Sequence, residues 1–299
     1  MKENNYQFFI SKKKDIFSFI IETPIFFYNF LFIFQRFSLK KNLDKVFKKN
    51  IKTLILANGP GLDKSINKIK LLRLKKKVQI MSVNTFPSKT YFSEIKPEFH
   101  CMIDSAFLKN YTYLNKGIKK NIKKTFKNLN RANWYLTVFV PKGSKKVLEK
   151  YLKNNYISII EVPSINYDFE SSLYIKLSSY LKMPPPRVNV AVTSIYLALL
   201  SEVRLIEIFG ADLSTFKDFD INQNNNNGYM NFKHFSNSKK DQYKFTHKLK
   251  KTKSNSMYIR LIRMASCFKW FAYLSLIAKN NKIILKNKSF YSLIDSIER

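Results

Sequence analysis

Short apolar runs recur along the chain from residue 51 onward, and a polar turn follows most of them. They are rich in β-branched and aromatic residues, which is typical of strands buried on both faces. The runs lie at residues 51–57, 78–84, 98–104, 134–141, 157–163, 203–212 and 282–287. Segments with helical spacing fall between most of them. The pattern predicts an α/β fold, with a Rossmann-like, mostly parallel sheet of about seven strands and helices on both faces.

The first fifty residues follow a different pattern. Residues 16–37 are dense in Phe and Ile, and a lysine-rich stretch follows. A membrane-spanning helix needs about 20 apolar residues with few breaks, and Glu22, Pro24 and Asn29 interrupt this run. We expect an aromatic helical segment that either lies on an anionic membrane surface or packs on the domain itself, and we favour the membrane slightly. The chain then divides into an N-terminal segment (1–50) and a Rossmann-like domain (51–299).

The net charge of +34 favours anionic partners, which include nucleic acid, anionic lipid and phosphorylated small molecules. Part of this charge reflects a composition rich in Lys, Asn, Ile and Phe. The lysine stripe on the amphipathic helix expected over residues 114–129 is typical of a solvated face. No zinc finger, helix-turn-helix or RRM-type signature is present, so we do not expect nucleic acid as a partner.

Cysteine and histidine are too sparse to suggest a metal centre. The two cysteines, Cys101 and Cys267, are far apart in sequence, and the chain has three histidines. Neither residue type shows metal-ligand spacing, so we expect no metal site. The cysteine usage fits a reducing, cytosolic compartment.

Polar clusters follow four of the expected strands. They are Asn58-Gly59-Pro60-Gly61, Asn84, Asp104 and Asp212. The carboxyl ends of parallel strands share one edge of a sheet, where open α/β proteins bind ligands. Glycines after the first strand let the backbone turn tightly, and N–H groups at the next helix start attract phosphate. Neither a GxGxxG nor a Walker motif is present, and a plain β-turn is the alternative for this glycine segment.

Three stretches carry a resemblance to a known family. "LILANGPGLDK", "MSVNTFPSKTYFSEIKPEFHCMIDSAF" and "NVAVTSIYLALLSEVRLIEIFGADLS" occur in this order. Together they resemble the bacterial CMP-sialic-acid-dependent sialyltransferases (glycosyltransferase family 42) and related O-antigen and capsule glycosyltransferases. The resemblance covers residues 51–299, with a poorly matched middle at 105–185. It implies an inverting, metal-independent transfer of sialic acid or a similar sugar from a CMP-type donor to a bacterial surface glycan such as lipooligosaccharide, O-antigen or capsule.

The resemblance also implies roles for single residues. The donor-binding set it implies is Asn58, Gly59, Pro60, Gly61, Asn84, Asp104, Asn189 and Asp212. Within this set, Gly61, Asp104 and Asn189 depart from the family pattern.

The same resemblance implies a His base and tyrosines that assist the leaving phosphate. His234 is the preferred base, because it lies in a lid-like loop (213–256) after the sixth strand. His247 is the reserve, whereas His100 lies inside a strand and is better explained as a packed residue. Tyr229 and Tyr243 are the candidate phenols.

The implied protein uses a nucleotide-sugar donor, a glycan or glycolipid acceptor and no separate cofactor. We would place it in the cytoplasm, peripheral to the inner face of the bacterial cytoplasmic membrane. Four alternatives stay open: a transferase with another nucleotide sugar, a nucleic-acid-binding protein, an inactive scaffold, and a pterin-type pyrophosphokinase. The last would need carboxylates for Mg²⁺, for which Asp104 and Asp212 are the candidates.

Overall fold

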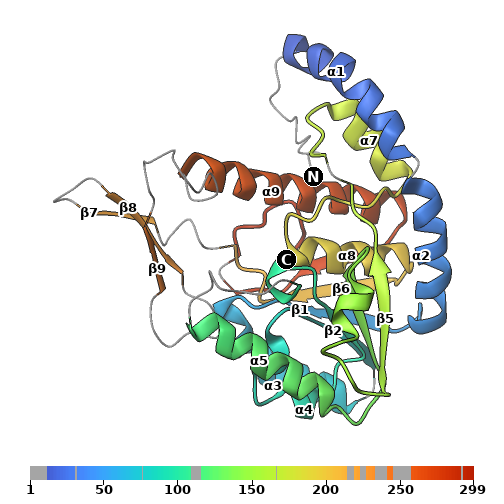
Figure 1. The fold of residues 1–299 in the computed structure, drawn as a ribbon. Helices are drawn as coiled ribbons and strands as arrows, with labels where there is room; N and C mark the ends of the chain where they lie inside the picture. Colours follow the sequence, from blue (N-terminus) through green and yellow to red (C-terminus); the bar gives the residue numbers. More distant parts are fainter. Residues whose placement is uncertain are drawn as a thin grey trace.

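The computed structural model describes most of the chain. The described residues are 12–30, 32–75, 77–108, 116–165, 167–213, 219–222, 227–232, 241–244, 257–290 and 292–299. Figure 1 shows a central sheet with helices packed on both sides.

A seven-stranded sheet forms the centre of the described chain, and every neighbouring pair in it is parallel. Its strands are β1 (Lys52–Leu56), β2 (Val78–Val83), β3 (Phe99–Cys101), β4 (Leu136–Pro141), β5 (Ile157–Val162), β6 (Leu205–Phe209) and β10 (Ile284–Asn287). The predicted strands and the α/β class are therefore confirmed. The strand order is β10-β6-β1-β2-β3-β4-β5. The chain builds outward from β1 on one side and then returns to its other side, so β1 and β6 form the switch point of the sheet.

Alternate side chains of the strands enter two different cores. Leu54 and Leu56 of β1 belong to one cluster and Ile55 belongs to the other. The helices on the Leu54 side are α3 (Ile66–Leu74), α4 (Phe92–Ile95), α5 (Lys116–Asn130) and α6 (Lys145–Leu148). The helices on the Ile55 side are α2 (Phe32–Val46), α7 (Ser172–Tyr180), α8 (Val190–Leu200) and α9 (Met257–Asn280). The sheet is thus buried on both faces, as its continuous apolar strands predict.

Helix α9 is a core helix despite its composition. Within the described part of the chain, its segment Leu261–Asn280 is the one unbroken helix long and apolar enough to cross a membrane. Its side chains Trp270, Phe271 and Leu274 are nevertheless fully buried in the core around α8. Trp270 also donates its indole N–H to Asp168 over 2.8 Å. Burial of this kind explains the apolar sequence without a bilayer.

The segment predicted to be a lid-like loop (213–256) contains β-strands that the sequence pattern does not predict. Three short strands, β7 (Phe219–Asn222), β8 (Asn227–Phe232) and β9 (Asp241–Lys244), form an antiparallel sheet. Figure 1 shows this smaller sheet on the left, set apart from the central one. Short polar strands like these carry a weak alternation signal, which the Asn-rich composition hides further.

The N-terminal segment forms two helices that are attached to the domain. Helix α1 (Lys12–Phe30) and helix α2 are bent by 46° relative to each other. Their side chains Phe26, Leu39 and Leu43 are buried in the same cluster as α8 and α9. The helical prediction for this segment is confirmed, and part of its apolar surface serves the core.

Glu22 faces the protein and not the solvent. Its side chain is 1% exposed, and its two carboxylate oxygens accept the backbone N–H groups of Glu170 and Ser171 over 2.7 and 3.0 Å. Ser171 precedes the first residue of α7, so this carboxylate satisfies N–H groups at the start of that helix. An acidic group in this position also interacts favourably with the helix dipole.

Replacing Glu22 with Ala should destabilise the fold, because two N–H groups at the start of α7 lose their acceptor. We expect a decrease of about 1–3 kcal/mol in the free energy of unfolding, measured by urea denaturation. The control is Glu149→Ala, since Glu149 is exposed and forms only a 3.9 Å ion pair with Lys145. That substitution should cost less than about 0.5 kcal/mol. Equal losses in both variants would contradict this role for Glu22.

Candidate functional site

The turns after β1 and β6 lie against each other. The N–H of Ala57 donates to the carbonyl of Phe209 over 2.8 Å, and the N–H of Gly59 donates to the carbonyl of Gly210 over 2.7 Å. These bonds extend the β1–β6 pairing beyond the strands and into the loops. Because β1 and β6 form the switch point of the sheet, this contact places the turns at the edge where open α/β proteins bind ligands.

Steric crowding explains why glycines occupy this turn. A Cβ on Gly59 would lie 2.4 Å from the carbonyl oxygen of Gly210 and 2.5 Å from Asp212 Oδ2. A Cβ on Gly61 would lie 2.9 Å from both Asp212 Oδ1 and the carbonyl oxygen of Phe290. Gly210 adopts a φ of +70°, and a Cβ there would meet the carbonyl of Ala57 at 2.6 Å. Any side chain at these positions would push the two turns apart.

Asp212 lies beneath the glycine turn. Its side chain is 3% exposed, and its Oδ2 accepts the N–H of Gly61 over 2.7 Å. Among the described residues Asp212 Oδ1 has no hydrogen-bond partner. Burial raises the pKa of Asp212, and the Gly61 N–H partly opposes that shift. A carboxylate of the protein therefore occupies the Gly61 N–H in this structure.

Asn58 and Asn84 lie at the same edge of the sheet, after β1 and β2 respectively. The Nδ2 of Asn58 donates to the carbonyl of Val83 over 3.1 Å and to Thr85 Oγ1 over 3.3 Å, which joins the β1 turn to the β2 turn. Asn84 has a left-handed φ of 44°, and its N–H donates to the carbonyl of Cys101 over 2.9 Å. The Oδ1 atoms of both residues are buried without a partner among the described residues.

Three side-chain oxygens without a donor thus end neighbouring strands of the sheet. They belong to Asp212 after β6, Asn58 after β1 and Asn84 after β2. Buried polar atoms are almost always hydrogen-bonded, and these three acceptors lack a donor within the described residues. We call these three residues the acceptor rim.

Two other members of the implied donor site have local structural tasks. The Oδ1 of Asp104 accepts the N–H of Ala106 over 2.8 Å and caps the short 3-10 helix Ser105–Phe107. The Oδ1 of Asn189 accepts the N–H of Ala191 over 2.7 Å and caps α8. Capping requires a short polar side chain at each position.

A basic group beside the rim escaped the sequence reasoning. Lys89 follows the 3-10 helix Phe86–Ser88, just after β2. Its pKa is lowered, chiefly by burial, while nearby Asp63 raises it and Lys124 of α5 lowers it. Tyr91 donates its hydroxyl to Asp63 over 3.3 Å, and burial raises the pKa of that phenol. Lys89 follows the Asn84 turn closely in the sequence, and this position could have identified it as a candidate site residue. Lys124 belongs to the lysine stripe that the sequence pattern assigns to a solvated face.

The implied catalytic residues are placed only in part. His234 and His247 lie outside the described residues, while Tyr229 and Tyr243 lie on β8 and β9. Their proposed roles stay predictions. His100 is buried, with Nδ1 2.9 Å from Ser82 Oγ, and burial lowers its pKa to about 3. It is therefore a neutral core residue at physiological pH.

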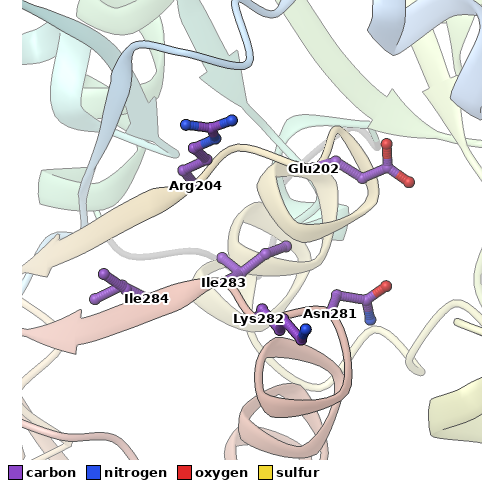
Figure 2. Close-up of a pocket in the computed structure, with 6 residues that line it drawn as sticks. All are labelled: Glu202, Arg204, Asn281, Lys282, Ile283 and Ile284. Atoms are coloured by element: carbon purple, nitrogen blue, oxygen red, sulfur yellow. The ribbon is translucent and has the colours of Figure 1, made fainter.

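Metal ligands and cavities do not identify another site. The described residues contain no group of three or more His, Cys, Asp or Glu side chains that could hold a metal ion. A hollow of about 530 Å³ is lined by Glu202, Arg204, Asn281, Lys282, Ile283 and Ile284. It lies where β6 and β10 begin, at the opposite edge from the acceptor rim. In Figure 2 the charged groups of Glu202 and Arg204 point away from each other, so they do not converge on a common ligand.

Replacing Gly59 with Ala should separate the two turns. The backbone of Gly59 is extended, with a φ of −71°, so the cost arises from the clash and not from the dihedral angles. We expect a loss of about 3 kcal/mol of unfolding free energy, measured by urea denaturation. Gly143→Ala is the control, since a Cβ there meets nothing within 4 Å although its φ is +81°. It should cost only about 1 kcal/mol of left-handed strain. A smaller loss at Gly59 than at Gly143 would contradict the crowding.

His100 should make the fold sensitive to acid. Its folded pKa is about 3, whereas an unfolded histidine titrates near about 6.5. The unfolded state therefore binds more protons below about pH 6.5, and stability falls as the pH decreases from there toward the folded pKa. Urea denaturation should show about 2 kcal/mol of this loss between pH 7 and pH 5. His100→Gln should reduce the difference between the two pH values, and an unchanged difference would refute the assignment.

A comparison with known families corrects the earlier family assignment. A family model described as "MptE-like: 6-hydroxymethylpterin diphosphokinase MptE-like" matches residues 26–218. No curated protein matches the chain. The resemblance to sialyltransferases was therefore misleading, and the glycosyltransferase activity and surface-glycan role inferred from it are wrong. The family match favours the pyrophosphokinase alternative.

The physical reason for that error lies in the turn itself. Gly59 is required where two backbones pass too closely for a side chain, and a similar crossing can serve different substrates. The shared motif indicates how the sheet edge is built and not what binds there. The matched residues include β1 to β6 and every residue of the acceptor rim. Since this match spans more than half of the sequence, the chain belongs to the MptE-like family.

Proposed function

We propose that this protein transfers a diphosphate group from a nucleoside triphosphate, such as ATP, to the hydroxymethyl group of a pterin-like acceptor. The observation that carries the proposal is the acceptor rim, whose unpartnered oxygens end three neighbouring strands at the switch point. The family description supplies the reaction class. The acceptor rim supplies a place for a ligand rich in hydrogen-bond donors.

The heterocycle suits the acceptor rim. A pterin carries an amino group and a ring N–H along one edge, and both are donors. The amide oxygens of Asn58 and Asn84 and the free oxygen of Asp212 are acceptors. A site built to pair such donors discriminates strongly against ligands that lack them, because its own polar atoms would then stay unpaired.

The triphosphate suits the basic group beside the rim. Burial is the main cause of the lowered pKa of Lys89, and repulsion from the nearby charge of Lys124 lowers it further. A polyanion placed between two such cations relieves their repulsion. The net charge of +34 adds a field that attracts a triphosphate from solution.

The transfer itself follows ordinary phosphoryl chemistry. The acceptor's hydroxyl oxygen bonds to the β-phosphorus, the bond from that phosphorus to the oxygen bridging the α-phosphorus breaks, and a nucleoside monophosphate leaves. The hydroxyl proton passes to solvent or to a base. A divalent cation bound to the triphosphate would neutralise its charge, but the described residues do not form a metal cage from protein ligands alone. The task left to these residues is orientation of the two substrates.

Incubation of the protein with ATP, Mg²⁺ and 6-hydroxymethylpterin tests this function. We expect AMP and a pterin diphosphate in equal amounts, detected by ³¹P NMR and chromatography. Asn84→Gly removes the amide while it keeps the left-handed backbone accessible. The variant should lower kcat/KM about tenfold, as expected for the loss of one substrate hydrogen bond.

The control is Lys96→Gly, which also removes a side chain at a left-handed position. Lys96 precedes β3 and so lies at the opposite edge of the sheet from Asn84. Its replacement should leave kcat/KM unchanged. Formation of ADP in place of AMP, or equal losses in both variants, would overturn the proposal.

A further inference from the structure

Within residues 18–30 of helix α1, two polar side chains are buried while several large apolar side chains are exposed. Glu22 is buried against α7, and Asn29 is also buried, with its Nδ2 donating to the carbonyl of Ile25. The neighbouring side chain of Phe27 is 66% exposed. A surface helix of a globular protein has the opposite arrangement. The exposed side of α1 therefore has a different task from the packing of the core.

Exposed apolar residues also lie on α2 and α7, the helices that contact α1. We define the outer apolar face by six side chains of these helices that are each more than half exposed, Ile20, Phe27, Phe34, Phe37, Leu173 and Tyr180. Figure 1 shows α1 and α7 side by side at the top of the molecule, away from α3 and α5 at the bottom. Helices α1 and α7 are in direct contact, and the rings of Phe19 and Tyr174 stack with centroids 5.1 Å apart. Large apolar side chains exposed on adjoining helices favour an interaction site on a soluble domain.

Lysines border this face on the same helices. Lys41, Lys45 and Lys48 are exposed on the second half of α2 and just beyond it, and Lys176 lies between Leu173 and Tyr180 on α7. An apolar face with a basic border complements the acyl chains and headgroups of an anionic bilayer. A second copy of the chain would instead bring the same lysines together, and two chains of charge +34 would repel each other. Charge complementarity thus selects the lipid surface.

We propose that the outer apolar face seats this protein on the surface of a membrane that contains anionic lipids. The segment lies on the bilayer and does not cross it, because Leu39 and Leu43 hold α2 in the core and Glu22 holds α1 on α7. The 46° bend also divides the segment into two pieces. The apolar pieces on the two sides of the bend are Ser18–Phe30 and Ile33–Val46. Each is shorter than the about 20 apolar residues that a spanning helix needs. This inference does not depend on the proposed reaction.

Vesicle co-sedimentation of the full chain tests the proposal. We expect binding to phosphatidylcholine vesicles with phosphatidylglycerol, weaker binding to pure phosphatidylcholine, and weaker binding in high salt. The double variant Phe27→Ser/Phe34→Ser should reduce partitioning at least about tenfold, since apolar burial drives interfacial binding. The control is Leu71→Ser/Leu74→Ser on α3, whose side chains are equally exposed on the opposite side of the sheet. It should bind like the unaltered chain.

A fluorescent label reports whether the face itself enters the lipid. Both native cysteines are buried, so a polarity-sensitive dye should react selectively with Phe27→Cys or with Leu74→Cys. Anionic vesicles should shift the emission of the first label to the blue and leave the second unchanged. Absence of vesicle binding, equal losses in both double variants, or equal emission shifts would overturn the proposal. The unaltered chain could instead form a dimer and fail to bind vesicles. If Phe27→Ser/Phe34→Ser dissociated that dimer, the face would be assigned to a second copy of the chain.

Discussion

The architecture of the rim depends on one close backbone contact. The turn after β1 touches the turn after β6 through the Gly59–Gly210 hydrogen bond, at a separation that leaves no room for a Cβ. This contact encloses Asp212 beneath the first turn, and its burial raises the pKa of that carboxyl. It also fixes Asn58, whose Nδ2 then reaches the β2 turn. A steric constraint on two glycines therefore positions oxygens from three strands.

Much of the fold follows from the sequence because buried parallel strands are continuously apolar. Each expected strand is present, and the polar residues after strands one, two and six do share an edge. The pairing of individual atoms was not predictable. That Asp212 occupies the Gly61 N–H depends on the register of two strands far apart in sequence. The caps at Asp104 and Asn189 are local, so a short polar residue before a helix start was a readable signal for both.

The misleading resemblance has an instructive physical basis. Motifs at strand ends combine two kinds of requirement, one from the backbone and one from the ligand. Gly59 and Gly61 meet a requirement of the backbone, since atoms of neighbouring residues leave no room for a side chain. The oxygens of Asn58 and Asn84 have no donor within the described protein, and we propose that a ligand supplies one. Families that share the first requirement can differ in the second, so glycine spacing is a poor guide to substrate.

Glu22 supports a different conclusion about the N-terminal helices once its hydrogen-bond partners are known. In the sequence, Glu22 argues against a membrane because a charge interrupts an apolar run. In the structure its carboxylate is used up at the start of α7, so the charge is absent from the outer surface. Phe26 faces inward and satisfies the core, whereas Phe27 is largely exposed and adds little to it. Folding alone thus does not explain the outward aromatic residues. The proposed docking of this lysine-bordered face on a lipid surface accounts for both their chemistry and their position.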